Sequence, residues 1–245
     1  TIYYTAFYLV STLAAIPYSI INVSIPRLSY LLKNKGKEIY EEKLNNSIAS
    51  LLFIIVPMCL GVFVLSKEII ILYAGKKYLA AIVPLMIACI TRIFISLESV
   101  MNNLVMYPNN REDRILKVSL ICGTSNLIIN YLLVTFKIFS PITALATTGL
   151  VELAVFITHY IYARRKMNIN VQVFSKKNMT YIILSFLFIP ISLLIRKFNL
   201  GFYITMILII ITCMLLYFIV LYIKKDNNLM FILDKFKNKL KVGKK

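Results

Sequence analysis

Charged side chains interrupt several long apolar stretches of this 245-residue chain, and they are the first candidates for chemistry. Arg92 and Glu98 lie in one such stretch, and Glu152 lies in another. A charge at the centre of a bilayer costs at least ~2.5 kcal/mol on insertion scales, so each should face a partner helix or a water-filled cavity. Because a guanidinium does not become neutral by losing a proton, Arg92 is predicted to line a polar cavity or bind an anion. A structural pair with a carboxylate is the alternative.

The two glutamates and the single histidine allow both functional and structural interpretations. Glu98 lies six residues after Arg92, about 240° around a helix, which is poor geometry for an ion pair between them. Glu152 is a candidate carrier of a proton or cation, and an interhelical hydrogen bond is an equal alternative. His159 shares a helix face with Glu152, but it lies near the end of its stretch, where a satisfied or surface-reaching side chain is favoured.

Amide side chains extend this polar set. Asn102 and Asn103 follow Glu98, while Asn126 and Asn130 lie in the next apolar stretch. Asn126 and Asn130 are four residues apart and share one helix face, so hydrogen bonding between helices is favoured over a role in substrate binding. Both interpretations remain open, and the polar set as a whole is predicted to line a transport path.

Motifs of catalysis and of metal binding are absent from the sequence. It contains no glycine-rich phosphate loop, no HExxH and no nucleophile elbow. The cysteines show no CxxC or Cys/His spacing, and all four lie within apolar stretches, where they are interpreted as packing residues: Cys59, Cys89, Cys122 and Cys213. We therefore expect no catalytic residue, no metal and no cofactor.

Seven apolar stretches must position the polar residues. A helix needs about 20 residues to cross an apolar layer of about 30 Å, and with no water present only continuous helix satisfies the backbone. The sequence predicts an all-α, polytopic membrane bundle of seven transmembrane helices. The predicted spans are residues 2–25, 48–65, 79–106, 116–136, 142–163, 179–195 and 202–223.

Basic residues are concentrated in alternate loops. Three quarters of the 28 lysines and arginines fall between the first and second, third and fourth, and fifth and sixth spans, or after the last span. The positive-inside rule then predicts a cytoplasmic C-terminus. The net charge of +18 is attributed to attraction for membrane lipids, and nucleic acid is not an expected partner.

Two segments between or after the spans have amphipathic patterns. Residues 224–245 place apolar residues at helical spacing between lysines, which predicts a basic amphipathic tail on the cytoplasmic side. Residues 26–47 mix leucines and charges, and Gly36 is expected to break this segment in two.

Several motifs together resemble those of a known transporter family. Pro26-Arg27-Leu28-Ser29 at the end of the first span is similar to a signature of bacterial polysaccharide flippases. The segment from Gly61 to Tyr78 resembles an outer loop of that family, and Tyr107-Pro108, the two asparagines of the fourth span and Glu152 follow in the family's order. The family is that of the Wzx-type lipid-linked oligosaccharide flippases, within the multidrug/oligosaccharidyl-lipid/polysaccharide exporter superfamily.

The resemblance implies a two-lobe exporter working by alternating access, of which this chain would be the second lobe. Residues 1–163 would form five helices of that lobe, 164–223 two additional helices and 224–245 the tail. The implied substrate is an undecaprenyl-pyrophosphate-linked oligosaccharide in a bacterial cell membrane, and a first lobe is an implied partner. Residues implied in substrate binding are Arg92, Arg27, Asn102, Asn126 and Asn130, with Glu98 and Glu152 as candidates for coupling to protons or sodium.

Some features depart from the family pattern. Residues 135–141 differ from the Pro and Gly-rich turn that is usual in the family, and Arg92 is a cavity candidate by depth and not by motif. The chain begins with Thr1, so we expect it to start inside a larger protein. A structural subunit of a polysaccharide-assembly complex, or an inactive fragment, would share the same hydropathy. An enzyme is disfavoured because the outer loops are short.

Overall fold

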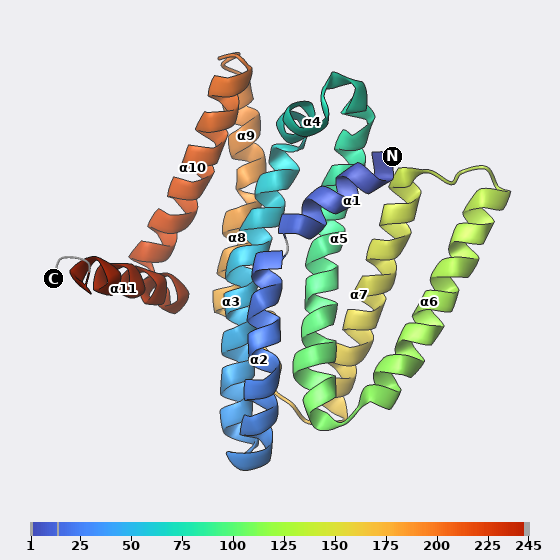
Figure 1. Ribbon diagram of the computed structural model, residues 1–245, viewed down its shortest axis with the longest axis vertical. Coiled ribbons are helices and arrows are strands. Elements are labelled where there is room, and N and C mark those ends of the chain that lie inside the picture. Colours follow the sequence, from blue (N-terminus) through green and yellow to red (C-terminus); the bar gives the residue numbers. More distant parts are fainter. Residues whose placement is uncertain (1, 14, 243–245) are drawn as a thin grey trace.

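The computed structural model describes residues 2–13 and 15–242, which fold into a set of long helices without a strand (Figure 1). The α-helices of this described part are α1 (Ile2–Leu13), α2 (Ala15–Asn34), α3 (Lys37–Val64), α4 (Ser66–Ala74), α5 (Ile82–Val100), α6 (Glu112–Thr135), α7 (Pro141–Arg165), α8 (Lys176–Phe186), α9 (Phe188–Arg196), α10 (Phe202–Ile223) and α11 (Asn227–Val242).

Six helical segments of the described residues are long and apolar enough to cross a membrane, as expected of a multi-pass membrane protein. They are Lys37–Val64, Lys76–Asn109, Glu112–Thr135, Pro141–Arg165, Lys176–Arg196 and Phe202–Ile223. The all-α class is confirmed, but the count of seven is not, because the predicted first span is divided between α1 and α2. Pro17 lies near the start of α2, where its missing N–H is tolerated, whereas inside one continuous helix it would remove a hydrogen bond.

The third predicted span contains a change of helix type. A 3₁₀ segment (Lys76–Ala81) leads into α5, and a π-helical segment (Met101–Met106) continues it to a second 3₁₀ turn (Tyr107–Asn109). The wider π turn carries Asn102 and Asn103. Single π turns are rare overall, but those that occur often lie at functional sites. The end of α5 is therefore a candidate functional region.

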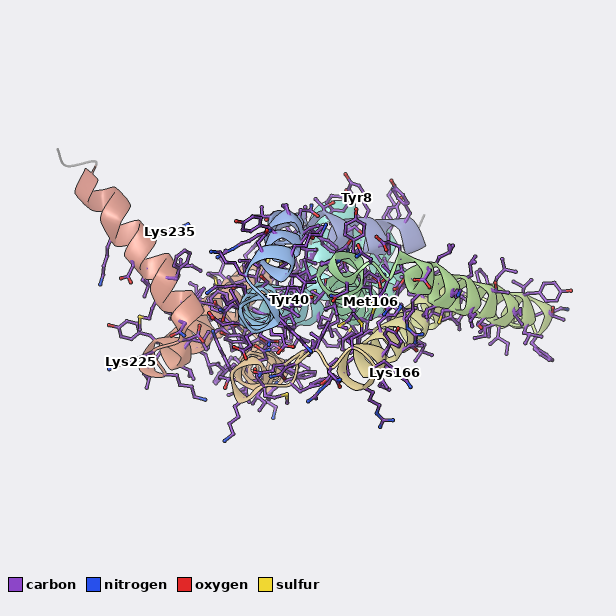
Figure 2. The ribbon with its side chains drawn as sticks, turned by 90° about the horizontal axis from the view of Figure 1, so that it is seen from below. Tyr8, Tyr40, Met106, Lys166, Lys225 and Lys235 are labelled. Atoms are coloured by element: carbon purple, nitrogen blue, oxygen red, sulfur yellow. The ribbon has the colours of Figure 1, made fainter. Side chains whose placement is uncertain are left out.

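Helix α3 is the centre of the arrangement. It packs against α2 and α5 on one side and against α8 and α9 on the other, while α7 packs on α5 and α6 packs on α7. Many of its apolar residues are fully buried, as expected for a helix that is apolar nearly all round. Its Tyr40 lies in the interior together with Met106 of the π segment (Figure 2). The helices α1, α2 and α5–α7 thus form one group, and α8–α11 join it mainly through α3.

Lysine-rich segments gather at one end of the bundle. The α2–α3 turn, the start of α6 and the end of α7 lie together at the lower end in Figure 1, and we call this the lysine-rich end. Gly36 adopts φ 88° between α2 and α3, which confirms the predicted break there. The predicted tail helix is confirmed as α11, whose Leu229 is buried and whose Phe231 is 61% exposed.

Polar contacts near both ends of α3 attach the α8–α11 group and the loop before it to the rest. The Arg196 guanidinium donates to both carboxylate oxygens of the buried Glu68, at 2.6 and 2.9 Å, and to the carbonyl of Val64 at 2.8 Å. Asn45 accepts from the backbone N–H of Gln172 and donates to the carbonyl of Asn170, both at 2.8 Å. The first contact lies at the end opposite the second, so α3 and α4 hold this group at both ends.

Gly149 is required for the close approach of α7 to α5. A Cβ at this position would lie 2.6 Å from Oγ1 of Thr91, which donates a hydrogen bond to the carbonyl of Leu145. We expect Gly149→Ala to lower the free energy of unfolding by about 1–3 kcal/mol, because the helices must separate or Thr91 must move. Unfolding of the purified protein in mixed micelles measures this change.

Gly123→Ala is the matched control, because it adds the same methyl group at an exposed position in the middle of α6, where nothing beyond the neighbouring residues and the backbone of its own helix lies within 4 Å of the added carbon. It should be neutral or stabilise by up to about 1 kcal/mol through helix propensity. Equal effects of the two alanines would contradict the packing argument.

Candidate polar site between the helices

Arg92 of α5 is buried, with 8% of its surface exposed. Its guanidinium donates a hydrogen bond to the Ser11 hydroxyl of α1 and lies over the Phe7 ring, 5.4 Å from the ring centre. None of the ion pairs formed by the described residues includes Arg92, and its Nε has no hydrogen-bond partner among them. A hydroxyl and an aromatic face therefore hold the cation, which leaves donor capacity on the guanidinium.

Helix α2 completes the surroundings of Arg92. Tyr18 of α2 lies within hydrogen-bonding reach of both Arg92 and Ser96. Ser96 is fully buried one turn after Arg92, and its hydroxyl donates to the Arg92 carbonyl at 2.8 Å. The break between α1 and α2 thus lets two differently directed helices contact one arginine.

Glu98 lies where α5 approaches its π segment. The Asn102 amide donates a hydrogen bond to the Glu98 carboxylate, while the Asn102 carbonyl oxygen is buried without a partner in the described structure. Asn103 instead donates to the Ser99 carbonyl at 2.9 Å and to the Ser99 hydroxyl at 3.0 Å. A carboxylate and an unpaired amide oxygen therefore lie side by side at the start of the wider turn.

Glu152 brings α7 into the same electrostatic neighbourhood. Its charge interacts with that of Arg92, and the charge of Glu98 interacts with that of Glu152. Cys122 of α6 also lies within range of Glu152. The structure thus brings together Arg92, Glu98 and Glu152, which the sequence places in two separate spans.

Asn130 links α6 to α7, and Asn126 supports it from within α6. The Asn130 amide donates to the Asn126 carbonyl oxygen at 2.8 Å, and the Thr147 hydroxyl of α7 donates to the Asn130 carbonyl oxygen at 3.0 Å. The interhelical hydrogen bonding that the sequence favoured is thus formed by Asn130, whereas the hydrogen bond of Asn126 stays within α6. Thr147 was missed, because nothing in its local sequence marks it as the partner of an asparagine in another helix.

Arg27 lies apart from these residues. It is exposed on α2, nine residues beyond Tyr18, which corresponds to about 13 Å along the helix axis. With Ser24, Lys43 and Ser47 it lines a separate pocket of about 210 Å³. Arg27 and Arg92 are therefore not parts of one local site.

His159 and three of the four cysteines are buried. His159 is fully buried beside Arg114, so it does not reach the surface. Cys59, Cys89 and Cys213 are buried. Among the described residues, no group of three or more His, Cys, Asp or Glu side chains is placed to hold a metal ion.

Comparison with family models, with curated proteins and with solved structures finds no match for the chain. What the fold and the site define is a multi-pass helical membrane protein with a buried arginine and two nearby glutamates between its helices.

The hydrogen bond between Thr147 and Asn130 should stabilise the contact of α6 with α7. Replacing Thr147 by valine keeps the side-chain shape and removes the hydroxyl, so we expect a loss of about 0.6–1.7 kcal/mol in the free energy of unfolding in mixed micelles. Thr148→Val is the control, because the Thr148 hydroxyl donates only within its own helix, to the Ala144 carbonyl at 2.9 Å. A control as damaging as Thr147→Val would count against the interhelical role.

Proposed function

We propose that this chain is the second lobe of an exporter that flips lipid-linked oligosaccharides, in which Arg92 attracts the diphosphate. The observation that carries the proposal is the buried guanidinium, which keeps its charge and lacks an ion pair among the described residues. A cation at this depth is expensive and is generally retained for function. Phosphate oxygens are strong acceptors for the donors of a guanidinium.

The two glutamates support coupling to protons or sodium. Glu98 and Glu152 interact electrostatically with each other, and Glu152 interacts with Arg92. Binding or release of a proton or sodium ion at either glutamate therefore changes the electrostatic potential at Arg92. In the proposed cycle, a proton or sodium ion at a carboxylate weakens its attraction for Arg92 and frees the guanidinium for phosphate. The unpaired carbonyl oxygen of Asn102 would accept a hydrogen bond from a sugar hydroxyl.

The remaining parts of the proposal rest on the sequence motifs and charges. The lysine-rich end would face the cytoplasm of a bacterial cell, with the C-terminus inside. Arg27, whose pocket also contains Lys43, would make an early contact with the diphosphate. A first lobe would close the other side of the path, and rocking of the two lobes would give alternating access. The substrate would be an undecaprenyl-pyrophosphate-linked repeat unit used for surface polysaccharide.

A structural subunit or an inactive fragment is the second candidate. It is favoured because several buried polar groups have hydrogen-bond partners inside the protein. One example is the chain of hydrogen bonds from Asn126 through Asn130 to Thr147. Such bonds hold helices together without a ligand. Transport activity that depends on Arg92 would separate the two candidates.

Replacing Arg92 by alanine in the full-length protein should abolish flipping while expression remains intact. The assay is restoration of surface polysaccharide in bacteria that lack their own flippase, with membrane levels of the protein measured in parallel. We expect Arg92→Ala to lower the amount of surface polysaccharide at least tenfold. This is the effect of losing a charge-assisted contact of about 1.4 kcal/mol or more. Arg92→Lys retains the charge and should keep part of the activity.

Arg165→Ala is the matched control, because Arg165 is exposed at the end of α7 and its loss removes the same charge. It should leave polysaccharide unchanged. Normal polysaccharide with Arg92→Ala would sink the proposal, and a full-length wild-type protein that restores nothing would favour the structural candidate.

A further inference from the structure

Four lysines from two helices line one pocket at the foot of the α8–α10 group. Lys176 and Lys177 belong to the first turn of α8, and Lys224 and Lys225 follow the last turn of α10. The pocket has a volume of about 300 Å³ and is completed by Thr180, Leu221, Asp226 and Asn227. Because α8–α9 and α10 run in opposite directions, the start of one and the end of the other meet (Figure 1).

The charge of this lysine pocket is poorly balanced. Asp226 is the one carboxylate among its lining residues, so the pocket has a net charge of +3. That carboxylate is already engaged, because it accepts from the Tyr181 hydroxyl at 2.7 Å and from the backbone N–H groups of Asn228 and Leu229 at 2.9 and 3.2 Å. Its contact with the Lys177 ammonium is 3.8 Å long. Like charges held this close together favour binding of an anion.

The start of α8 adds a positive partial charge at the pocket, while the end of α10 adds a negative one, so the net positive potential comes from the lysines. Helix α8 begins at the pocket, and its first N–H groups have no carbonyl partners within the helix. Lys225 adopts φ 50°, a conformation that costs energy for a residue with a side chain, and it lies at the edge of the molecule near the foot of α11 (Figure 2). The left-handed turn ends α10 and keeps the Lys225 side chain among the residues that line the pocket.

The surroundings of the pocket indicate what kind of anion reaches it. Its lysines flank two segments that are apolar enough to cross a membrane, so the pocket borders the layer of lipid head groups. Its volume is large enough for a lipid head group, but it is too small to hold the acyl chains in addition. We infer that the lysine pocket binds the phosphate group of an anionic membrane lipid, a function independent of the transport proposal and remote from Arg92.

Native mass spectrometry of the full chain, released from nanodiscs of equal parts phosphatidylglycerol and phosphatidylcholine, tests the inference. Wild-type protein should retain phosphatidylglycerol in preference to phosphatidylcholine. Replacing Lys176, Lys177, Lys224 and Lys225 by glutamine should lower that preference about tenfold or more, because it removes the four ammonium groups that line one pocket and would act on the same phosphate. If this variant does not fold, Lys176→Gln with Lys224→Gln keeps the contact between Lys177 and Asp226 and should lower the preference in the same direction.

The matched control replaces four exposed lysines of the lysine-rich end that lie outside the pocket, namely Lys33, Lys35, Lys117 and Lys166, by glutamine. It removes the same charge and should leave the preference nearly unchanged. Equal losses in the two variants, or no loss in either, would overturn the inference. Displacement of phosphatidylglycerol by inorganic phosphate would identify soluble phosphate as the ligand and overturn the lipid assignment, whereas no displacement supports the lipid head group.

Discussion

The scarcity of water within the apolar layer is the constraint on which the rest of the structure depends. Polar groups at this depth must find partners inside the protein, and those partners often lie on another helix. The Tyr40 hydroxyl of α3 donates to the Leu104 carbonyl at 2.7 Å, and the Tyr217 hydroxyl of α10 donates to the Phe53 carbonyl at 2.8 Å. Each hydrogen bond fixes how one helix is rotated about its axis relative to its neighbour. Apolar packing alone would not specify this rotation.

The architecture separates two kinds of positive charge. Arg92 lies among α1, α2, α5 and α7, where a single cation is surrounded by hydroxyls, an aromatic ring and the charge of Glu152. The lysine pocket belongs to α8 and α10, which reach the first group mainly through α3. Among the described residues, contacts between the two sites therefore run mainly through α3.

Long helices were predictable because hydropathy is a local property, and residues 202–223 were predicted with the bounds that α10 has. The break between α1 and α2 was not, because an average over many apolar residues hides the effect of Pro17. The π segment has no signature in helical periodicity. The contact of Asn126 with Asn130 could be predicted from spacing, but Ser11 lies 81 residues from Arg92, and such pairings depend on how whole helices pack.

Helix α3 is longer than the apolar layer of a membrane is thick. Its 28 residues extend about 42 Å, whereas the apolar layer measures about 30 Å. The charged start of α3 and the end of α2 therefore extend beyond the apolar layer as a stiff helical hairpin closed at Gly36 (Figure 1). For a 28.2 kDa chain, this projection is a natural attachment point for a rigid fusion partner or an antibody fragment in electron cryomicroscopy.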